Sequence, residues 1–294
     1  TWDVDYLRDN RDENMGFLSK TLLPDGTEIP GTNFDYNYLQ HRKVDVVSSA
    51  LDFILPFEKY KITAGAKVSF TNTRNGINYD TSDPTLVQDD YFRYKEQIYA
   101  LYADYSREYS ERFSMQLGLR MEHTRTTGIS EAKDTEDKHD YTRLFPTVYL
   151  LYSPTDGHAL NFSFSNRISR PSQNMVNPFP FYQNKYTYAC GREDLKPSYT
   201  YNVELGYTLK NNFNVSAYYS YSDDVFFQVV DLDAETNVTS FLWENFMQTH
   251  AFGLNNSYTF RTKWLQAYAQ HGVSYRRTTS SAATTSPEEK GWAY

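Results

Sequence analysis

The feature that most constrains the fold is a two-residue alternation of apolar and polar side chains that persists over long stretches. Between residues 61 and 71, every second side chain is apolar, and the residues between are Lys, Thr, Gly or Ser. The same rhythm returns at residues 113–122, 160–165, 201–209 and 213–219. A helix would scatter these apolar residues around its axis, whereas a strand collects them on one face. The pattern predicts an all-β protein of about eleven strands.

The predicted strands are long. Many run for about ten residues, the length that a tilted strand needs to cross a bilayer, whereas strands of globular proteins average about five or six. No apolar run in the sequence approaches the roughly 18 to 20 residues of a membrane-spanning helix. An α-helical membrane protein is therefore excluded, and a membrane protein built of strands is not.

The connections between the predicted strands alternate in length. Short turns are expected near residues 57–60, 107–112, 153–158, 210–212 and 261–263. Long polar loops are expected near residues 22–35, 72–91, 126–140, 171–198, 222–244 and 277–289. Outer-membrane barrels have tight periplasmic turns and long extracellular loops, whereas a Greek-key sandwich would not keep this order. We therefore predict an antiparallel, up-and-down transmembrane β-barrel embedded in a lipid bilayer.

Aromatic residues make up 17% of the chain and gather beside the short turns, as Phe57, Tyr60, Tyr105 and Phe113 do. Amphipathic rings suit the membrane interface, so a girdle is predicted at this level. The apolar strand faces are expected to meet lipid. The opposite faces are expected to meet a wet or plugged lumen, and they carry Lys61, Lys67, Arg120, Glu122 and Glu204.

A membrane-spanning sheet must close on itself, because hydrocarbon offers no partner to an open strand edge. About eleven strands is an odd count for a bacterial barrel, and the sequence stops at residue 294 in what resembles the start of another strand. We therefore expect residues 1–294 to be a single segment of an incomplete barrel, about half of one, without a plug domain or a terminal strand.

The sequence offers little sign of catalysis. The net charge is -8 and no basic cluster stands out, so nucleic acid is not an expected partner. There is one cysteine, Cys190, and none of the six His residues lies three or four positions from another. Residues 231–237 resemble half of a calcium loop but lack its turn glycine and its closing glutamate. We expect no catalytic, cofactor-binding or metal site; a carboxylate pair of Glu122 and Glu204 stays an open alternative.

Residues 167–209 carry the most specific motif. Arg167-Ile168-Ser169-Arg170-Pro171 is followed by Asn177-Pro178-Phe179, Gly191, Asp194-Leu195-Lys196-Pro197 and Glu204-Leu205-Gly206-Tyr207. This series resembles the outer-membrane barrels of TonB-dependent receptors, especially those common in Bacteroidetes. Residues 144–148 and the Asn245-Phe246 region resemble that family in place and spacing. The sequence departs from the family pattern at Arg192-Glu193 and at Ser198.

The resemblance implies a function and partners. It implies the bacterial outer membrane as the location and uptake of a nutrient, such as a siderophore, a cobalamin, a glycan or a peptide. In the full-length protein it implies a plug domain and a TonB-type energy-coupling protein; a surface lipoprotein is a further candidate partner. Two alternatives stay open from the residues: a barrel-based enzyme or adhesin, and a soluble all-β carbohydrate-binding module.

The motif also predicts an ordered loop after a strand that ends at Arg170, because several prolines remove strand hydrogen-bond donors there. Its aromatic residues would either stack on sugar rings, peptides or chelates, or pack on their neighbours and close the barrel mouth; the second interpretation is favoured. The candidate contact residues of the motif are Arg170, Pro171, Asn177, Pro178, Phe179, Gly191, Leu195 and Pro197, and those of the aromatic loop are Phe181, Tyr182, Tyr186 and Tyr188.

Overall fold

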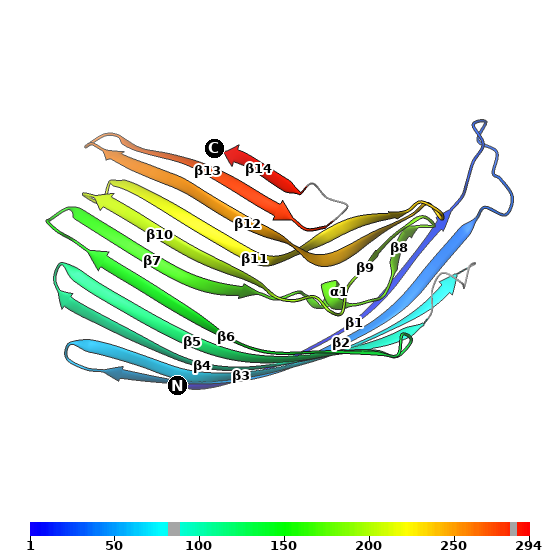
Figure 1. Cartoon of the computed structure of the whole chain (residues 1–294), viewed down its shortest axis with the longest axis horizontal. Coiled ribbons are helices and arrows are strands. Elements are labelled where there is room, and N and C mark those ends of the chain that lie inside the picture. Colours follow the sequence, from blue (N-terminus) through cyan, green and yellow to red (C-terminus); the bar gives the residue numbers. More distant parts are fainter. Residues whose placement is uncertain (82–88, 283–286) are drawn as a thin grey trace.

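The chain forms one curved antiparallel sheet of twelve successive strands in a computed structural model that describes residues 1–81, 89–282 and 287–294 (Figure 1). The strands are β1 (Trp2–Ser19), β2 (Phe34–Pro56), β3 (Tyr60–Thr81), β4 (Asp90–Ser110), β5 (Phe113–Ser130), β6 (Thr135–Tyr152), β7 (His158–Ser169), β10 (Ser198–Leu209), β11 (Phe213–Asp233), β12 (Val238–Arg261), β13 (Gln266–Ser280) and β14 (Glu288–Ala293). Each pairs with the next along the chain, which confirms the predicted all-β, up-and-down architecture. Strands β1 and β14 are the two edge strands of this order, and both are labelled in Figure 1.

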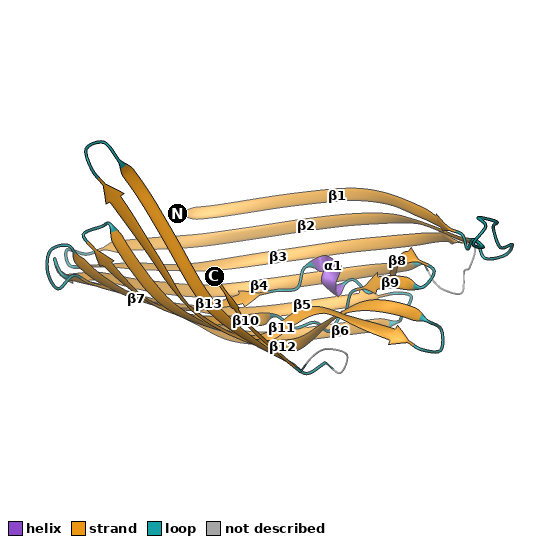
Figure 2. Ribbon diagram, turned by 90° about the horizontal axis from the view of Figure 1, so that it is seen from above, coloured by secondary structure: helices purple, strands orange, loops and turns teal. Residues whose placement is uncertain are grey.

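One segment leaves this sheet between β7 and β10. Residues 170–197, called here the inward loop, contain the helix α1 (Gln173–Val176) and the short strands β8 (Phe181–Asn184) and β9 (Thr187–Cys190). The inward loop lies on the concave side of the sheet (Figures 1 and 2), and β9 pairs in parallel with residues 239–242 of β12. No helix in the described part of the chain is long and apolar enough to cross a bilayer.

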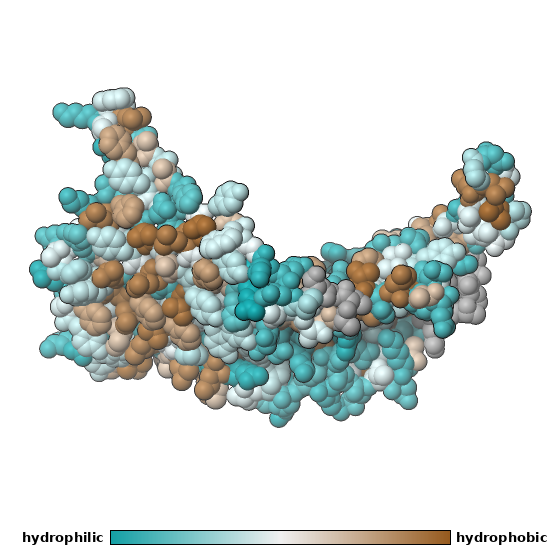
Figure 3. Space-filling model, turned by 45° about the horizontal axis from the view of Figure 1, so that its top comes forward, coloured by the Kyte–Doolittle hydropathy of each residue, from teal (hydrophilic) through white to brown (hydrophobic). Residues whose placement is uncertain are grey.

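The outward side chains form a continuous apolar band near the short turns. Neighbouring strands place Leu51 opposite Ala66, Ala66 opposite Leu101, and Leu101 opposite Met121. These side chains do not pack into a core: Leu119, in the same band, is 50% exposed. Figure 3 shows hydrophobic residues gathered over the end of the sheet that carries the short turns. Such a band is what a lipid-facing surface requires.

Aromatic rings border this band on both sides. Beside the short turns, the Phe57 and Tyr60 rings lie 4.5 Å apart and Tyr60 contacts Tyr105, as the predicted girdle requires. A second belt, which we did not predict, includes Phe70 beside Tyr99 at a centroid distance of 5.8 Å. On the other flank of the sheet, this second belt continues as Tyr201, Tyr221 and His250. Along β3 the two belts lie at residues 60 and 70, a separation that matches the roughly 9 to 11 residues of a transmembrane strand.

The predicted long loops are partly wrong. Strand β5 continues to Ser130 and β6 begins at Thr135, so the loop expected at 126–140 is a tight hairpin. The loop expected at 222–244 is likewise reduced to residues 234–237, and β3 runs to Thr81 into the loop expected at 72–91. Parts of two expected loops, residues 82–88 and 283–286, lie outside the described residues. The strands extend well beyond the bilayer because apolar and polar residues continue to alternate there. In these extensions the apolar side chains face inward and the polar side chains face outward.

The inversion is visible in burial. Beyond the second belt, the inward side chains Phe34, Tyr36, Ile77 and Phe92 are 0 to 2% exposed. They form a core with residues of the inward loop, namely Val176, Phe179, Tyr182 and Leu195. The sheet thus has an apolar outer face within the membrane and an apolar inner face outside it.

Candidate binding site: the inward loop and the lumen

The inward loop is closed by its own backbone. The Gly191 N–H donates to the Asn177 carbonyl at 2.8 Å, and the Arg192 N–H donates to the Met175 carbonyl at 2.8 Å. A Cβ atom on Gly191 would lie 2.3 Å from the Asn177 oxygen, a contact that only glycine avoids. Two parts of the motif that are separated in sequence, Asn177-Pro178-Phe179 and Gly191, therefore meet in space.

Most aromatic residues of the inward loop pack on the sheet. Phe179 is 1% and Tyr182 is 8% exposed. The hydroxyls of Tyr36 and Tyr79 donate to the Pro180 carbonyl at 3.1 and 3.2 Å. Of the residues predicted for this loop, Phe181, Tyr188, Asn177, Pro178 and Leu195 are buried or half-buried, whereas Tyr186 is 53% exposed. Contact with a ligand stays a prediction for these side chains.

Charged and polar contacts tie the loop to the hairpin of β5 and β6. The Lys133 ammonium donates to the Pro178 carbonyl at 3.4 Å. The Thr135 hydroxyl donates to the Glu193 carboxylate at 3.1 Å. Burial raises the pKa of Glu193 from its ordinary value, although the Thr135 hydrogen bond opposes this shift. The loop is therefore held over the concave face on the side of β5 and β6.

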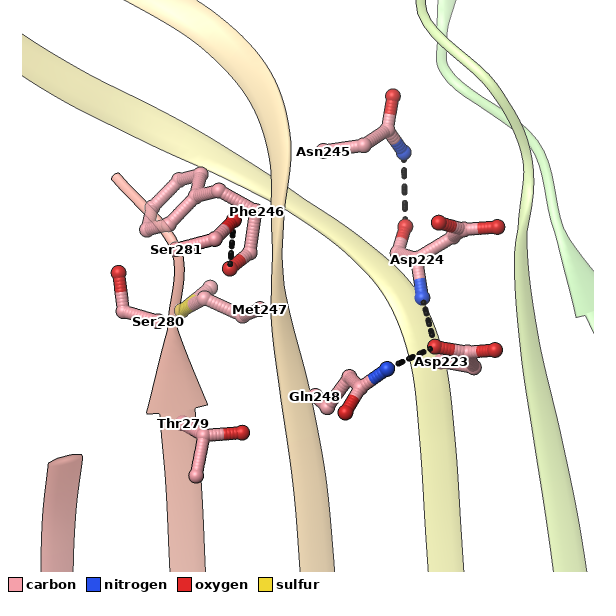
Figure 4. A pocket seen from close by; sticks show the side chains of 9 residues that line it. All are labelled: Asp223, Asp224, Asn245, Phe246, Met247, Gln248, Thr279, Ser280 and Ser281. Carbon is pink, nitrogen blue, oxygen red and sulfur yellow. Dashed lines mark hydrogen bonds between the residues drawn. The ribbon is translucent and has the colours of Figure 1, made fainter. Parts of the chain in front are cut away.

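On the opposite side, the side chain of Asn245 in β12 binds the inward loop to the sheet through hydrogen bonds. Its side-chain oxygen accepts the Lys196 N–H at 2.9 Å, and its amide nitrogen donates to the carbonyls of Lys196 and Asp224 at 2.9 and 2.7 Å. Figure 4 shows Asn245 at the rim of a cavity of about 270 Å³, where Gln248 also donates to Asp223 at 2.9 Å. The sequence placed Asn245 in a family-like region but gave no role for its side chain.

A second tether at β12 is electrostatic. The Arg192 guanidinium lies 2.6 Å from Glu244 and 2.7 Å from Asp194. Its hydrogen bonds to Asp194 hold the pKa of that carboxyl below the ordinary value. Arg192 departs from the family pattern, and here it joins the loop to β12.

Arg170 links the start of the inward loop to a buried carboxylate. The Arg170 guanidinium donates to Glu122, which is 3% exposed, and to the Thr124 hydroxyl at 3.2 Å. Arg120 donates to the same carboxylate at 2.5 and 3.0 Å, and Glu96 lies 3.7 Å from Arg170. A buried carboxylate is stable only when paired in this way.

These charges border a cavity of about 550 Å³ on the lumen face. Its polar lining includes Lys67, Tyr102, Asp104, Arg120, Glu122 and Arg170. Glu204 lines a separate cavity of about 270 Å³, so the structure pairs Glu122 with Glu96 through Arg170 rather than with Glu204. Pro171 and Pro197 bound the inward loop at the ends of β7 and β10.

The calcium-like segment 231–237 comprises the last residues of β11 and the turn at 234–237 that joins β11 to β12, and Asp233 accepts a hydrogen bond from the Thr236 hydroxyl at 2.7 Å. Within residues 1–81, 89–282 and 287–294, no group of three His, Cys, Asp or Glu side chains is arranged to hold a metal ion.

A lipid-facing band, two aromatic belts and a polar lumen define an outer-membrane β-barrel wall. The sequence matches the family model described as outer membrane protein beta-barrel family over residues 1–294, and the chain belongs to this family of the bacterial outer membrane. The predicted resemblance is confirmed at this level. The comparison with curated proteins gives no match.

Several solved structures share the fold. The copper transporter OprC matches with a TM-score of 0.60 and 13% identity, over 95% of this chain and 48% of that chain. A mutant ferric enterobactin receptor (PfeA) from Pseudomonas aeruginosa, in complex with enterobactin, has a TM-score of 0.55 and 12% identity over 95% and 45% of the two chains. The ferripyoverdine receptor of Pseudomonas aeruginosa has a TM-score of 0.52 and 15% identity over 99% and 41%. The chain thus spans less than half the length of each, and these likenesses show the fold alone.

Proposed function

We propose that the chain is part of the barrel wall of a receptor that imports a nutrient across the outer membrane, energised by a TonB-type protein and gated by a plug domain in the full-length protein. The observation that carries this proposal is the anchoring of the inward loop. It is bound to β2 and β3 through Pro180, to β6 through Glu193 and to β12 through Lys196. A loop fixed at several points narrows the lumen, which suits selective capture better than free diffusion.

The lumen chemistry supports a polar substrate. The cavity beside Glu122 presents cations and carboxylates together, and Tyr186 keeps an exposed ring on the loop. A siderophore, a cobalamin, a glycan or a peptide would each use such groups. The proposal includes no catalysed reaction, and the protein acts by binding and by guiding the substrate through the wall.

The test is uptake by whole cells. Cells that carry the full-length protein, cells that lack it and cells that lack the TonB-type partner would be compared with radiolabelled members of the four substrate classes. We expect accumulation of one class only when both proteins are present and the proton gradient is intact. Uptake that survives loss of the partner, or a full-length protein that fractionates without detergent, would refute the proposal.

A further inference from the structure

The outer surface of the sheet carries a cationic patch just beyond the second aromatic belt. Lys43 of β2 lies directly opposite Arg74 of β3, and Arg74 lies directly opposite Arg93 of β4. Lys95 lies two residues from Arg93 on the same strand face. Lys43, Arg74, Arg93 and Lys95 are called here the cationic patch.

The side chains of the cationic patch point away from the lumen. Their sequence neighbours Thr73, Asn75 and Phe92 are 0 to 2% exposed on the inward face. Because successive strand residues alternate between the two faces, Arg74 and Arg93 lie on the outward face. The Arg93 guanidinium also lies 5.8 Å from the centre of the Tyr91 ring on that face.

The cationic patch has no ion-paired protein counter-charge of its own. Lys43 interacts electrostatically with Asp45, but that carboxylate is already paired with Arg8. Among the residues that the structure describes, none of its four cations is within ion-pair distance of a carboxylate. The outward carboxylates nearby are already paired: Asp45 with Arg8 at 2.6 Å, Asp140 with Arg125 at 2.8 Å and Glu136 with Lys138 at 2.8 Å. Like charges directly opposite each other in a sheet are destabilising. An anion from outside the protein would remove this cost.

The height of the cationic patch identifies the source of that anion. Arg74 follows the belt residue Phe70 by four positions, which is roughly 10 Å along the membrane normal for a tilted strand. The headgroup layer begins at the belt, and long cationic side chains can reach back into it. Arginine and lysine on this face therefore meet the headgroups of the outer leaflet.

We propose that the cationic patch binds the phosphate groups of a phosphorylated glycolipid in the outer leaflet of the outer membrane. Guanidinium groups form paired hydrogen bonds with phosphate oxygens, and lysines add point charges. Adjacent cations on three strands match a headgroup that carries more than one phosphate.

The experiment uses the full-length protein purified in mild detergent, with bisphosphorylated lipid A as the probe and native mass spectrometry as the readout. The test variant is R74Q/R93Q. The matched control is R125Q/K138Q, which removes the same charge from the same outward face where each cation already has a carboxylate partner. Heat-modifiable migration in gels verifies that each variant is folded; if R74Q/R93Q does not fold, K43Q/K95Q carries the same prediction.

We expect R74Q/R93Q to bind lipid A about tenfold more weakly than the unmodified protein, with the control unchanged. We also expect lipid A without phosphates not to be retained. Equal loss in test and control variants, or equal retention of the dephosphorylated lipid, would overturn the proposal. Complete displacement by millimolar inorganic phosphate would also overturn it, because the site would then be one for free phosphate.

Discussion

The long strands of the sheet have two halves. The membrane half lies between the two aromatic belts, as residues 60–70 of β3 do, and the outer half lies beyond the second belt, as residues 71–81 of β3 do. In the membrane half the outward face is apolar, and in the outer half the inward face is apolar. In the membrane half, Leu119 faces outward and is 50% exposed, while its neighbour Arg120 faces the lumen cavity. In the outer half, Tyr36 faces inward and is 0% exposed, while Lys43 faces outward. The pairing of β2 with β3 continues through both halves without a register shift. A strand can therefore run from the membrane into water without a break in its pairing. The only change is that the apolar residues move from the outward-facing positions to the inward-facing positions.

The two halves consequently have different sources of stability. The membrane half needs lipid on its outer face, because its apolar side chains have no protein partner there. The outer half has water on that face, and its apolar residues are covered from inside by the inward loop. The inward loop thus supplies to the outer half the apolar contact that lipid supplies to the membrane half.

The largest expected effect comes from removing that cover. Phe179→Ala deletes a ring that is 1% exposed and packs edge-on against Phe92. We expect a loss of about 3 to 5 kcal/mol in the stability of the outer half, as for other large-to-small core changes. Hydrogen exchange should accelerate in residues 34–40 but not in residues 62–68. Tyr186→Ala, on the exposed side of the same loop, is the control; equal effects from both would contradict the role of the loop as a core element.

The second prediction places one substitution in both halves. Leu119→Arg puts a cation on the lipid face near mid-membrane, which costs about 2 to 4 kcal/mol. Leu39→Arg makes the same change on the outward face of the outer half, where Leu39 is 39% exposed to water, and should change stability by less than about 0.5 kcal/mol. Denaturant titration of the protein refolded in lipid vesicles measures both. Similar costs would mean that the boundary between the halves is misplaced.

The sequence was sufficient to predict the strands of the membrane half and its first aromatic belt, although not the second belt. There the alternation of residues 61–71 and 113–122 keeps one phase, and the aromatic belt beside Phe57 and Tyr60 lies next to recognisable turns. The outer half was mistaken for loops because the apolar parity changes along β3, from Phe70 on the outward face to Ile77 on the inward face. The alternation does not stop in these extensions. A search for positions where the apolar residues change from one strand face to the other would have found them.

The site was predicted only in its pieces. The prolines and aromatic residues of 171–188 indicated an ordered loop, but period and composition do not say that Asn177 meets Gly191, or that Arg170 reaches Glu122. Those contacts join residues far apart in sequence, and they depend on where the inward loop lies against the sheet. The role of Asn245 was missed because a single amide in a strand carries no local signal.

A third prediction concerns the close approach inside the loop. Gly191→Ala forces its new Cβ against the Asn177 carbonyl, so the loop backbone must move, at a cost of about 1 to 3 kcal/mol. Gly76→Ala in the outer half meets only the Tyr91 ring at 3.6 Å and is the control. Protease resistance of the inward loop in folded protein measures the difference. If the loop of the Gly191→Ala protein resists protease as well as the loop of the unmodified protein, the close approach of Gly191 to Asn177 is not needed for a stable loop.

A fourth prediction tests the hydrogen bonds of Asn245 in β12. Asn245→Ala removes three hydrogen bonds to Lys196 and Asp224. We expect a loss of about 1 to 2 kcal/mol that is confined to the inward loop and to β11 near Asp224, where the pairing of β11 with β12 shifts register. Asn245→Asp keeps the acceptor for the Lys196 N–H and should retain part of the stability. Hydrogen exchange of the Lys196 amide is the readout. Unchanged exchange in the alanine variant would exclude a stabilising role for the Asn245 hydrogen bonds.

The smallest effect should come from the exposed ion pair of Arg192 and Asp194. The pKa of Asp194 is lowered in the folded protein, so its contribution is present above its unfolded value of about 3.9 and is lost as the pH falls through the lower folded value. The carboxylate is 55% exposed, so solvent screening limits the gain to a few tenths of a kcal/mol. Asp194→Asn should therefore loosen the loop slightly at pH 7 and not at a pH below the folded value, whereas Phe179→Ala should weaken it at both. A difference for Asp194→Asn that persists at low pH would assign its effect to packing rather than to charge.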